Sequence, residues 1–192
     1  MNFQKQLLFL FLLATLTANA QTLNEAIQKK DTVLASKLIS QGSDPNQKDE
    51  NGTTLLMTAS RFSEVDIARF LINHGATINQ PRSPKGRTNL MVACAYYSGI
   101  NMVQLLVEKG ADVNLTADDG STALMLASAF EKLDVVNFLL AHGANASMKD
   151  KAGKTALDFA AGGKVEDWMK TSIKDSRIDK DKTIESLKAA MK

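Results

Sequence analysis

Two histidines are the first side chains in this sequence that could do chemistry. His74 and His142 each stand directly before a glycine, and each glycine follows an apolar run with helical spacing. Imidazoles bind a metal or exchange protons in catalysis only where they converge with other groups. These two hold the same position in a sequence that repeats itself, so we expect them to lie far apart. Each histidine can instead satisfy the last carbonyls of its own helix.

The remaining candidates for chemistry are few. Cys94 is the single cysteine, which excludes an internal disulfide and a cysteine-rich metal site, and its apolar surroundings predict an inert small hydrophobe. The sequence contains no P-loop, dinucleotide-binding fingerprint, nucleophile elbow or metalloprotease helix. We therefore expect a protein that is not an enzyme, with no catalytic residue, cofactor or metal. The alternative is a small-ligand carrier or an enzyme whose site is not visible in the sequence, which a deep polar pocket with a shifted pKa would favour.

The elements that position these residues come from a repeat of about 33 residues. Glycines that suit tight turns occur at Gly52, Gly86, Gly120 and Gly153, in steps of 34, 34 and 33 residues. Glycines that suit helix ends occur in steps of 33, 35 and 33 residues, at Gly42, Gly75, Gly110 and Gly143. Each unit therefore reads as a turn, a short helix and a longer helix that ends at glycine.

A threonine follows each turn glycine and is itself followed two residues later by leucine, and three residues beyond that by alanine. The threonines are Thr54, Thr88, Thr122 and Thr155. This pattern resembles the T-P-L-H-x-A signature of the ankyrin-repeat family. The proline is replaced by Leu55, Asn89, Ala123 and Ala156, and the histidine by Met57, Met91, Met125 and Asp158. Because methionine donates no hydrogen bond, thioether packing must replace part of the family's polar network.

The resemblance implies an all-α solenoid of about five helix-turn-helix repeats, joined by projecting β-turns and closed by terminal capping helices. We place the repeats at about 22–48, 49–81, 82–116, 117–149 and 150–174, within a domain of residues 21–174. In the first repeat we expect Val33, Leu34, Leu38 and Ile39 to face inward. In the fifth, the second helix should hold Val165, Trp168, Met169 and Ile173. Residues 175–192 are charged and form either a capping helix, through Ile184, Leu187 and Met191, or a solvated tail.

Residues 1–20 have the pattern of a secretory signal peptide. Lys5 precedes an almost wholly apolar run from Leu7 to Leu16, and Ala18-Asn19-Ala20 offers a cleavage site before Gln21. The run is about half the roughly 20 residues that a spanning helix needs, so we expect no membrane insertion after cleavage. We expect the mature protein in the periplasm, or alternatively secreted.

The charge balance bears on the class of partner. The whole chain carries a formal charge of +2, which falls to about +1 without Lys5, so no basic surface for nucleic acid is predicted. The resemblance to ankyrin repeats implies a protein-binding module. Exported members of the family suggest a periplasmic adaptor or inhibitor of one partner protein, which is monomeric when free. It could be an immunity protein against a toxic effector, or the protector of a catalase or peroxidase.

The aromatic residues at the end of each first helix are the candidate partner-binding residues. Aligning the repeats on their threonines superposes Phe62, Tyr96 and Phe130, and in ankyrin-like folds this position borders the concave groove together with the residue after each turn glycine. Aromatic and arginine side chains often dominate binding energy. The predicted set is Arg61, Phe62, Arg87, Tyr96, Tyr97 and Phe130. The alternative is that these rings only fill the seam between paired helices.

Overall fold

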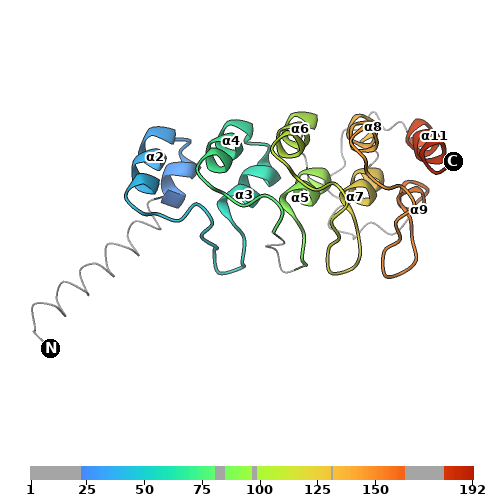
Figure 1. Cartoon of the computed structure of the whole chain (residues 1–192), viewed down its shortest axis with the longest axis horizontal. Coiled ribbons are helices and arrows are strands. Elements are labelled where there is room, and N and C mark those ends of the chain that lie inside the picture. The colour runs from blue at the N-terminus through green and yellow to red at the C-terminus, as the bar shows by residue number, and fades with distance from the viewer. Residues whose placement is uncertain (1–22, 81–84, 97–98, 131, 163–179) are drawn as a thin grey trace, which may run out of the picture.

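The structure is a computed structural model, and it describes residues 23–80, 85–96, 99–130, 132–162 and 180–192. Its helices stand side by side in one elongated row, with the chain running from one end of the row to the other (Figure 1). Residues 23–28 form the first helix. The helices after it are α2 (Thr32–Ser40), α3 (Leu55–Phe62), α4 (Val65–Asn73), α5 (Asn89–Ala95), α6 (Ile100–Glu108), α7 (Ala123–Ala129), α8 (Leu133–Ala141), α9 (Ala156–Ala160) and α11 (Lys180–Ala190).

Threonine caps set where the short inner helices begin. Each cap is in an extended conformation, and its hydroxyl accepts a hydrogen bond from the backbone N–H three residues later, which satisfies one of the free donors at a helix N-terminus. The distance is 3.3 Å at Thr54, Thr88 and Thr122, and 3.4 Å at Thr155. In α7 the thioether of Met125 also accepts the N–H of Thr122 at 3.4 Å. The thioether of Met125 thus accepts a hydrogen bond at this cap, although methionine has no hydrogen-bond donor in its side chain.

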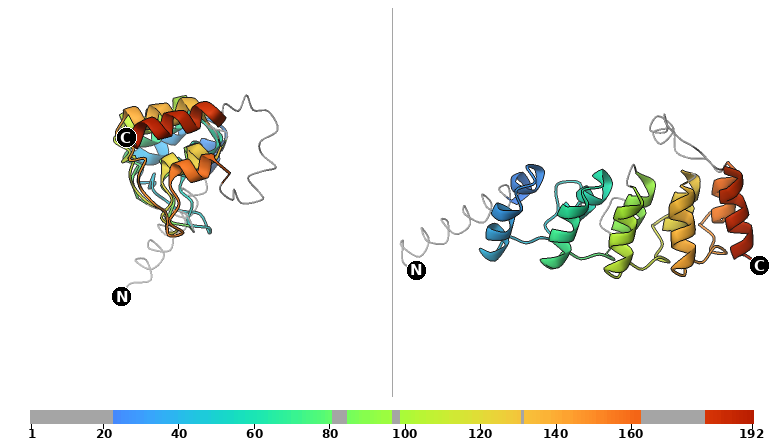
Figure 2. Two further views of the ribbon diagram at one scale, coloured as in Figure 1. Left: turned by 90° about the vertical axis from the view of Figure 1, so that its right-hand side faces the viewer. Right: turned by 90° about the horizontal axis from the view of Figure 1, so that it is seen from above.

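The inner helices lie in one layer and the outer helices in a second, and the turns between repeats project away from both layers to one side (Figure 2). The turn glycines have positive φ, for example +75° at Gly52 and +82° at Gly120, which other residues adopt only with strain. Single antiparallel bridges close two of the turns, Lys48 with Thr54 and Thr116 with Thr122, and the described residues contain no longer strand. The predicted all-α solenoid with projecting turns is confirmed.

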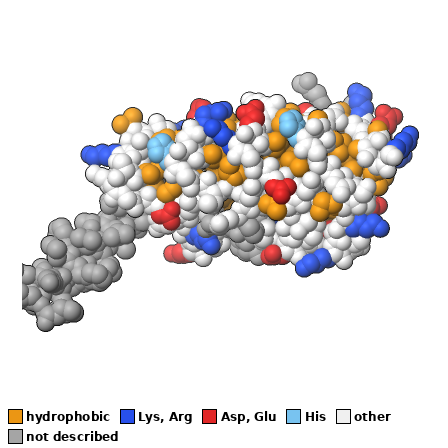
Figure 3. All heavy atoms as spheres, in the orientation of Figure 1, with side chains coloured by type: hydrophobic (Ala, Val, Ile, Leu, Met, Phe, Trp, Pro, Cys, Tyr) orange, Lys and Arg blue, Asp and Glu red, His pale blue; other side chains and the backbone are white. Residues whose placement is uncertain are grey.

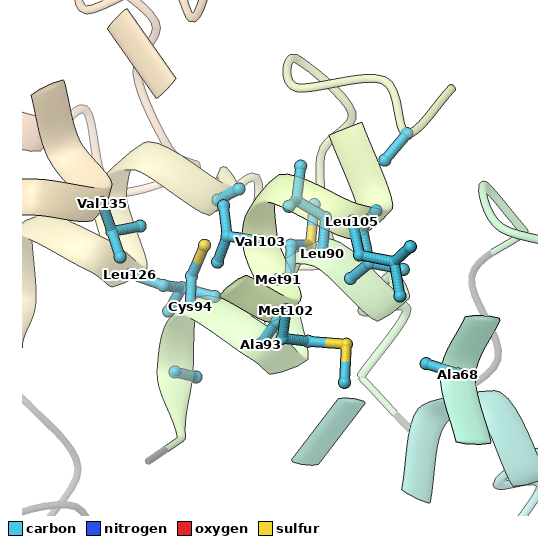
Figure 4. Packing of buried hydrophobic residues seen from close by; sticks show 14 of the residues in the cluster. Ala68, Leu90, Met91, Ala93, Cys94, Met102, Val103, Leu105, Leu126 and Val135 are labelled. Atoms are coloured by element: carbon cyan, nitrogen blue, oxygen red, sulfur yellow. The ribbon is translucent and has the colours of Figure 1, made fainter. Parts of the chain in front are cut away.

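The core runs along the inner layer and between the layers. Leu56, Leu90 and Leu124, at the same position of successive repeats, are each 1% exposed. Figure 4 shows how this core passes from one repeat to the next, with Cys94 of α5 lying beside Leu126 and Val135. Leu157, at the same position of the last repeat, is only half-buried.

Asparagine side chains join the projecting turns to one another. Asn114 donates from Nδ2 to the carbonyl of Gly143 at 2.9 Å, and its Oδ1 accepts the backbone N–H of Asn145 at 2.8 Å. Asn46 and Asn79 make the same pair of bonds to the repeats that follow them. The fourth repeat has Ser147 at this position, so this series of side-chain bonds ends there.

The fifth repeat is completed by the last helix of the chain. Its outer helix is α11, which packs against α9 of its own repeat and against α8 of the fourth repeat, as the other outer helices do (Figure 1). Leu187 is fully buried and Thr183 lies beside it in the interface, so α11 has the apolar stripe that this place requires. The helix expected over Val165, Trp168, Met169 and Ile173 lies outside the described residues, as does the predicted signal peptide.

The first outer helix departs from its prediction. Val33 is 81% exposed and Leu34 is 36% exposed, although both were expected to face inward. The residues that α2 buries are Ala35 and Leu38. A helix at the end of a row has a neighbouring repeat on one side only, so its apolar residues on the other side stay in solvent.

Candidate protein-binding site

The end of α3 presents an arginine and a phenylalanine together. Arg61 and Phe62 form the last turn of the helix, which stops at Ser63 because this residue adopts a left-handed conformation with φ of 59°. Both side chains are exposed, and Phe62 keeps 63% of its surface in solvent. A phenylalanine this exposed is unusual in the described residues, whose other large exposed hydrophobics are Val33, Leu34 and Met191.

Arg61 connects this turn to the next repeat. Its guanidinium carbon lies 4.7 Å from the centre of the Tyr96 ring and 5.5 Å from the centre of the Phe62 ring. Tyr96 is the residue that ends α5, and it is half-buried against the core. The arginine therefore lies over two rings from adjacent repeats, an arrangement that cation–π attraction stabilises. Arg61, Phe62 and Tyr96 form the group that we call the Arg61 cluster.

Lys132 extends the contact to the fourth repeat. Its amine donates a hydrogen bond to the carbonyl oxygen of Tyr96 and lies 5.9 Å from the centre of the Phe130 ring. Phe130 follows the last residue of α7 and is half-buried, so its ring packs against the core and is also partly accessible at this edge. Sequence reasoning missed Lys132, although a cation two residues after an aromatic helix end was visible in the sequence.

One predicted site residue among the described ones is buried rather than exposed at this edge. Arg87 was expected beside the rings, but it is only 8% exposed. It stands between the turn glycine Gly86 and the cap Thr88, and its charge helps to keep the pKa of the Asp119 carboxyl in the next turn below its ordinary value. Burial of Asp119 raises this pKa, and hydrogen bonding by Ser121, whose backbone N–H donates to the carboxylate at 2.8 Å, lowers it more than the charge of Arg87 does. Tyr97 lies outside the described residues.

Cys94 and Lys132 have shifted pKa values with one main cause. Burial raises the pKa of the Cys94 thiol to about 12, which the charge of Lys132 reduces only in part. Burial likewise lowers the pKa of the Lys132 amine. Since the thiolate is the nucleophilic form of cysteine, Cys94 stays a neutral packing group at neutral pH.

The histidines serve their own helix ends. Nδ1 of His74 lies 2.8 Å from the carbonyl oxygen of Phe70, and Nδ1 of His142 lies 2.8 Å from that of Phe138. Each imidazole also packs on that phenylalanine ring. Figure 3 shows the two histidines well separated along one face, where acidic and basic side chains are mixed. In the part of the chain that the structure describes, no three histidine, cysteine or carboxylate side chains gather as a metal site would require. No helix there has the length and apolar character to cross a membrane.

Comparison with known proteins identifies the scaffold. A family model described as ankyrin repeats in three copies matches residues 23–117 and 94–171, which together span most of the chain. This chain belongs to the ankyrin-repeat family. The predicted membership is thereby confirmed. Ankyrin repeats are protein–protein interaction modules and are generally not catalytic.

Relatives of this ankyrin-repeat chain come from very different sources. It is 32% identical over 129 residues to Neurogenic locus notch homolog protein 1 of Xenopus tropicalis, which is 67% of this chain and 5% of that protein. It is 32% identical over 113 residues to a putative ankyrin repeat-containing protein of Treponema pallidum, or 59% of this chain and 38% of the relative. A putative ankyrin repeat protein of fowlpox virus is 34% identical over 130 residues, which is 64% of this chain and 38% of that protein. The alignments thus span well under half the length of these relatives.

Proposed function

We propose that this chain is an exported, non-catalytic adaptor or inhibitor that binds one partner protein at the concave face, with the Arg61 cluster and Phe130 at the edge of the contact. The observation that carries the proposal is the exposed Phe62 ring beside Arg61 and Tyr96. Large rings and arginine are the side chains that most often dominate protein interfaces. A ring in solvent adds little to the stability of the free chain. A partner that covers the ring buries apolar surface, and this burial favours binding.

The proposed location rests on the sequence of residues 1–20. An export signal of this type delivers a protein to the periplasm, or out of the cell. The partner would then be an exported enzyme, such as a catalase or peroxidase that it protects, or a toxic effector that it blocks as an immunity protein. The free protein is proposed to be monomeric.

The proposal is tested by capture from a periplasmic extract with purified mature chain as bait. The bait is compared with Phe62→Ala and with the control Val33→Ala, which removes another exposed apolar side chain, on helix α2 of the first repeat. We expect Phe62→Ala to weaken capture of the main partner by about 1–3 kcal/mol, as loss of a central aromatic residue does, and Val33→Ala to leave it unchanged. Equal capture by Phe62→Ala and the unaltered bait would overturn the proposed site.

A further inference from the structure

Arg61 is held in place without using its hydrogen-bond donors. Its guanidinium lies over the rings of Tyr96 and Phe62 at 4.7 and 5.5 Å, and among the described residues it makes no hydrogen bond and no ion pair. A guanidinium carries five N–H donors in a planar fork, and contact with rings uses its flat face rather than those donors. The fork of Arg61 is therefore oriented in advance and open to an acceptor from outside the chain.

The neighbouring cations are engaged within the protein. Lys30, at the corresponding edge of the first repeat, forms an ion pair with Glu64 at 2.9 Å. Lys132 donates to the carbonyl oxygen of Tyr96. Among the cations described at this edge, Arg61 is therefore the one whose donors stay unused within the chain.

An exposed apolar surface lies directly beside this charge. Phe62 follows Arg61 in the chain, contacts its guanidinium and keeps most of its own surface in solvent. A ligand that satisfied only the arginine would leave this ring uncovered. The arrangement suits a ligand with an anionic group and an apolar group next to each other.

We propose that the Arg61 cluster binds a carboxylate side chain of the partner polypeptide, with an apolar side chain of the same segment covering Phe62. This inference rests on the function proposed above and specifies the chemistry of the partner. The fork of arginine matches the two oxygens of a carboxylate. A phosphoryl group carries a charge of about −1.5 to −2 and is typically bound by several arginines, whereas one arginine balances the single charge of a carboxylate.

The test uses short capped peptides as probes and the ¹⁵N-labelled chain, observed by NMR at the amides of the Arg61 cluster and at the Nε–H of Arg61. The peptides share one sequence, Gly-Leu-X-Gly, in which X is glutamate, glutamine or phosphoserine. A further peptide has glycine in place of leucine before glutamate. The variants are Arg61→Gln, Arg61→Lys and the control Arg69→Gln on the outer helix α4, where the side chain is also exposed.

We expect the Leu-Glu peptide to shift the Arg61 Nε–H and Phe62 signals with millimolar affinity, and the glutamine peptide to bind about tenfold more weakly, because a charge-assisted hydrogen bond is lost. The glycine-containing peptide should also bind more weakly. Arg61→Gln should abolish the difference between glutamate and glutamine. Arg61→Lys should reduce it, and Arg69→Gln should leave it intact.

Equal binding of the glutamate and glutamine peptides, or shifts remote from Arg61, would overturn the inference. Tighter binding of the phosphoserine peptide would assign the cluster to a phosphoryl group instead and would also overturn it. Failure of the inference is distinguishable from failure of the proposed function. If Phe62→Ala lowers partner capture while Arg61→Gln does not, the binding site stands and the carboxylate preference is wrong.

Discussion

The three rings at the ends of the inner helices differ in how much they contribute to the core. Phe62 is mostly in solvent, whereas Tyr96 and Phe130 are half-buried and pack against core residues. The sequence alone could not separate the two explanations, binding or packing, because all three rings occupy equivalent positions. The exposed fraction of each ring separates the two explanations, since only a ring in solvent is wholly available to a partner.

The cost of removing each ring should follow this difference. We expect Phe62→Ala to change the free energy of unfolding by less than about 0.5 kcal/mol, as surface substitutions do. Phe130→Ala should cost about 1–3 kcal/mol, because part of its ring is in the core. Urea denaturation followed by circular dichroism measures both values. A loss of stability as large for Phe62→Ala as for Phe130→Ala would place Phe62 in the core in solution.

Asp158 gives the last inner helix a titratable group at the position where α3, α5 and α7 have methionine. Hydrogen bonds from the backbone N–H and the hydroxyl of Thr155, at 2.8 and 2.7 Å, lower the pKa of this carboxyl below its ordinary value. A carboxyl with a lowered pKa in the folded state stabilises the fold above its unfolded pKa, near 4. That contribution is lost as the pH falls through the folded value.

The melting temperatures of the unaltered chain and Asp158→Ala should therefore differ at pH 6 and converge as the pH falls below about 4. Asp158→Met, which introduces the residue of the other repeats, is the informative companion because it packs without titrating. Scanning calorimetry at a series of pH values measures the difference. A difference that stayed constant between pH 6 and pH 2.5 would show that the carboxyl is not stabilised by its hydrogen bonds.

At the scale of the elements, the projecting turns depend on glycine for two separable reasons. Gly120 and Gly153 both have positive φ, at 82° and 77°. A Cβ on Gly120 would lie 2.8 Å from the backbone nitrogen of Lys151, whose N–H donates to the carbonyl oxygen of Asp119 at 2.9 Å. A Cβ on Gly153 would meet nothing within 4 Å. A residue at position 120 must therefore adopt a positive φ and also lack a side chain, whereas at position 153 only the positive φ is required.

Alanine at the two positions should separate these requirements. Gly153→Ala should cost about 1–2 kcal/mol, the strain of a left-handed alanine. Gly120→Ala should cost about 1–3 kcal/mol more, since overpacking against backbone forces adjacent turns apart. Chemical denaturation measures the free energy of unfolding for each variant. Equal costs at both positions would mean that the turns of the fourth and fifth repeats do not touch in solution.

The sequence predicted the elements well wherever a side chain or glycine acts on its own repeat. Threonine caps, turn glycines and the leucines of the inner helices depend on local spacing, and the structure has them as expected. Predictions failed where the outcome depends on a neighbouring repeat. Val33 has no repeat on its open side, Arg87 is buried near the turn of the next repeat, and Lys132 reaches back to Tyr96. Spacing within one repeat does not contain that information.

At the scale of the whole molecule, the main helix contacts among the described residues join each repeat to its immediate neighbours. Inner helices contact inner helices, outer helices contact outer helices, and α11 completes the outer layer at the C-terminal end. Stability in such an array is a sum of repeat energies and nearest-neighbour interfaces. A buried substitution should therefore have consequences that depend on its place in the row.

Leu124 and Leu187 allow this dependence to be measured, because both are leucines with 1% or less of their surface exposed. Leu124 lies in α7, between α5 and α9, whereas Leu187 lies in α11 at the end of the outer layer. Each truncation to alanine should cost about 2–5 kcal/mol locally.

Leu187→Ala should raise amide hydrogen exchange in α8, α9 and α11 and leave α3 and α4 protected, since the damage stays at one end. Leu124→Ala should break the row in its middle, so that denaturation splits into two transitions because the interfaces on both sides of α7 weaken. A single cooperative transition for Leu124→Ala, with exchange raised equally in every repeat, would contradict nearest-neighbour coupling.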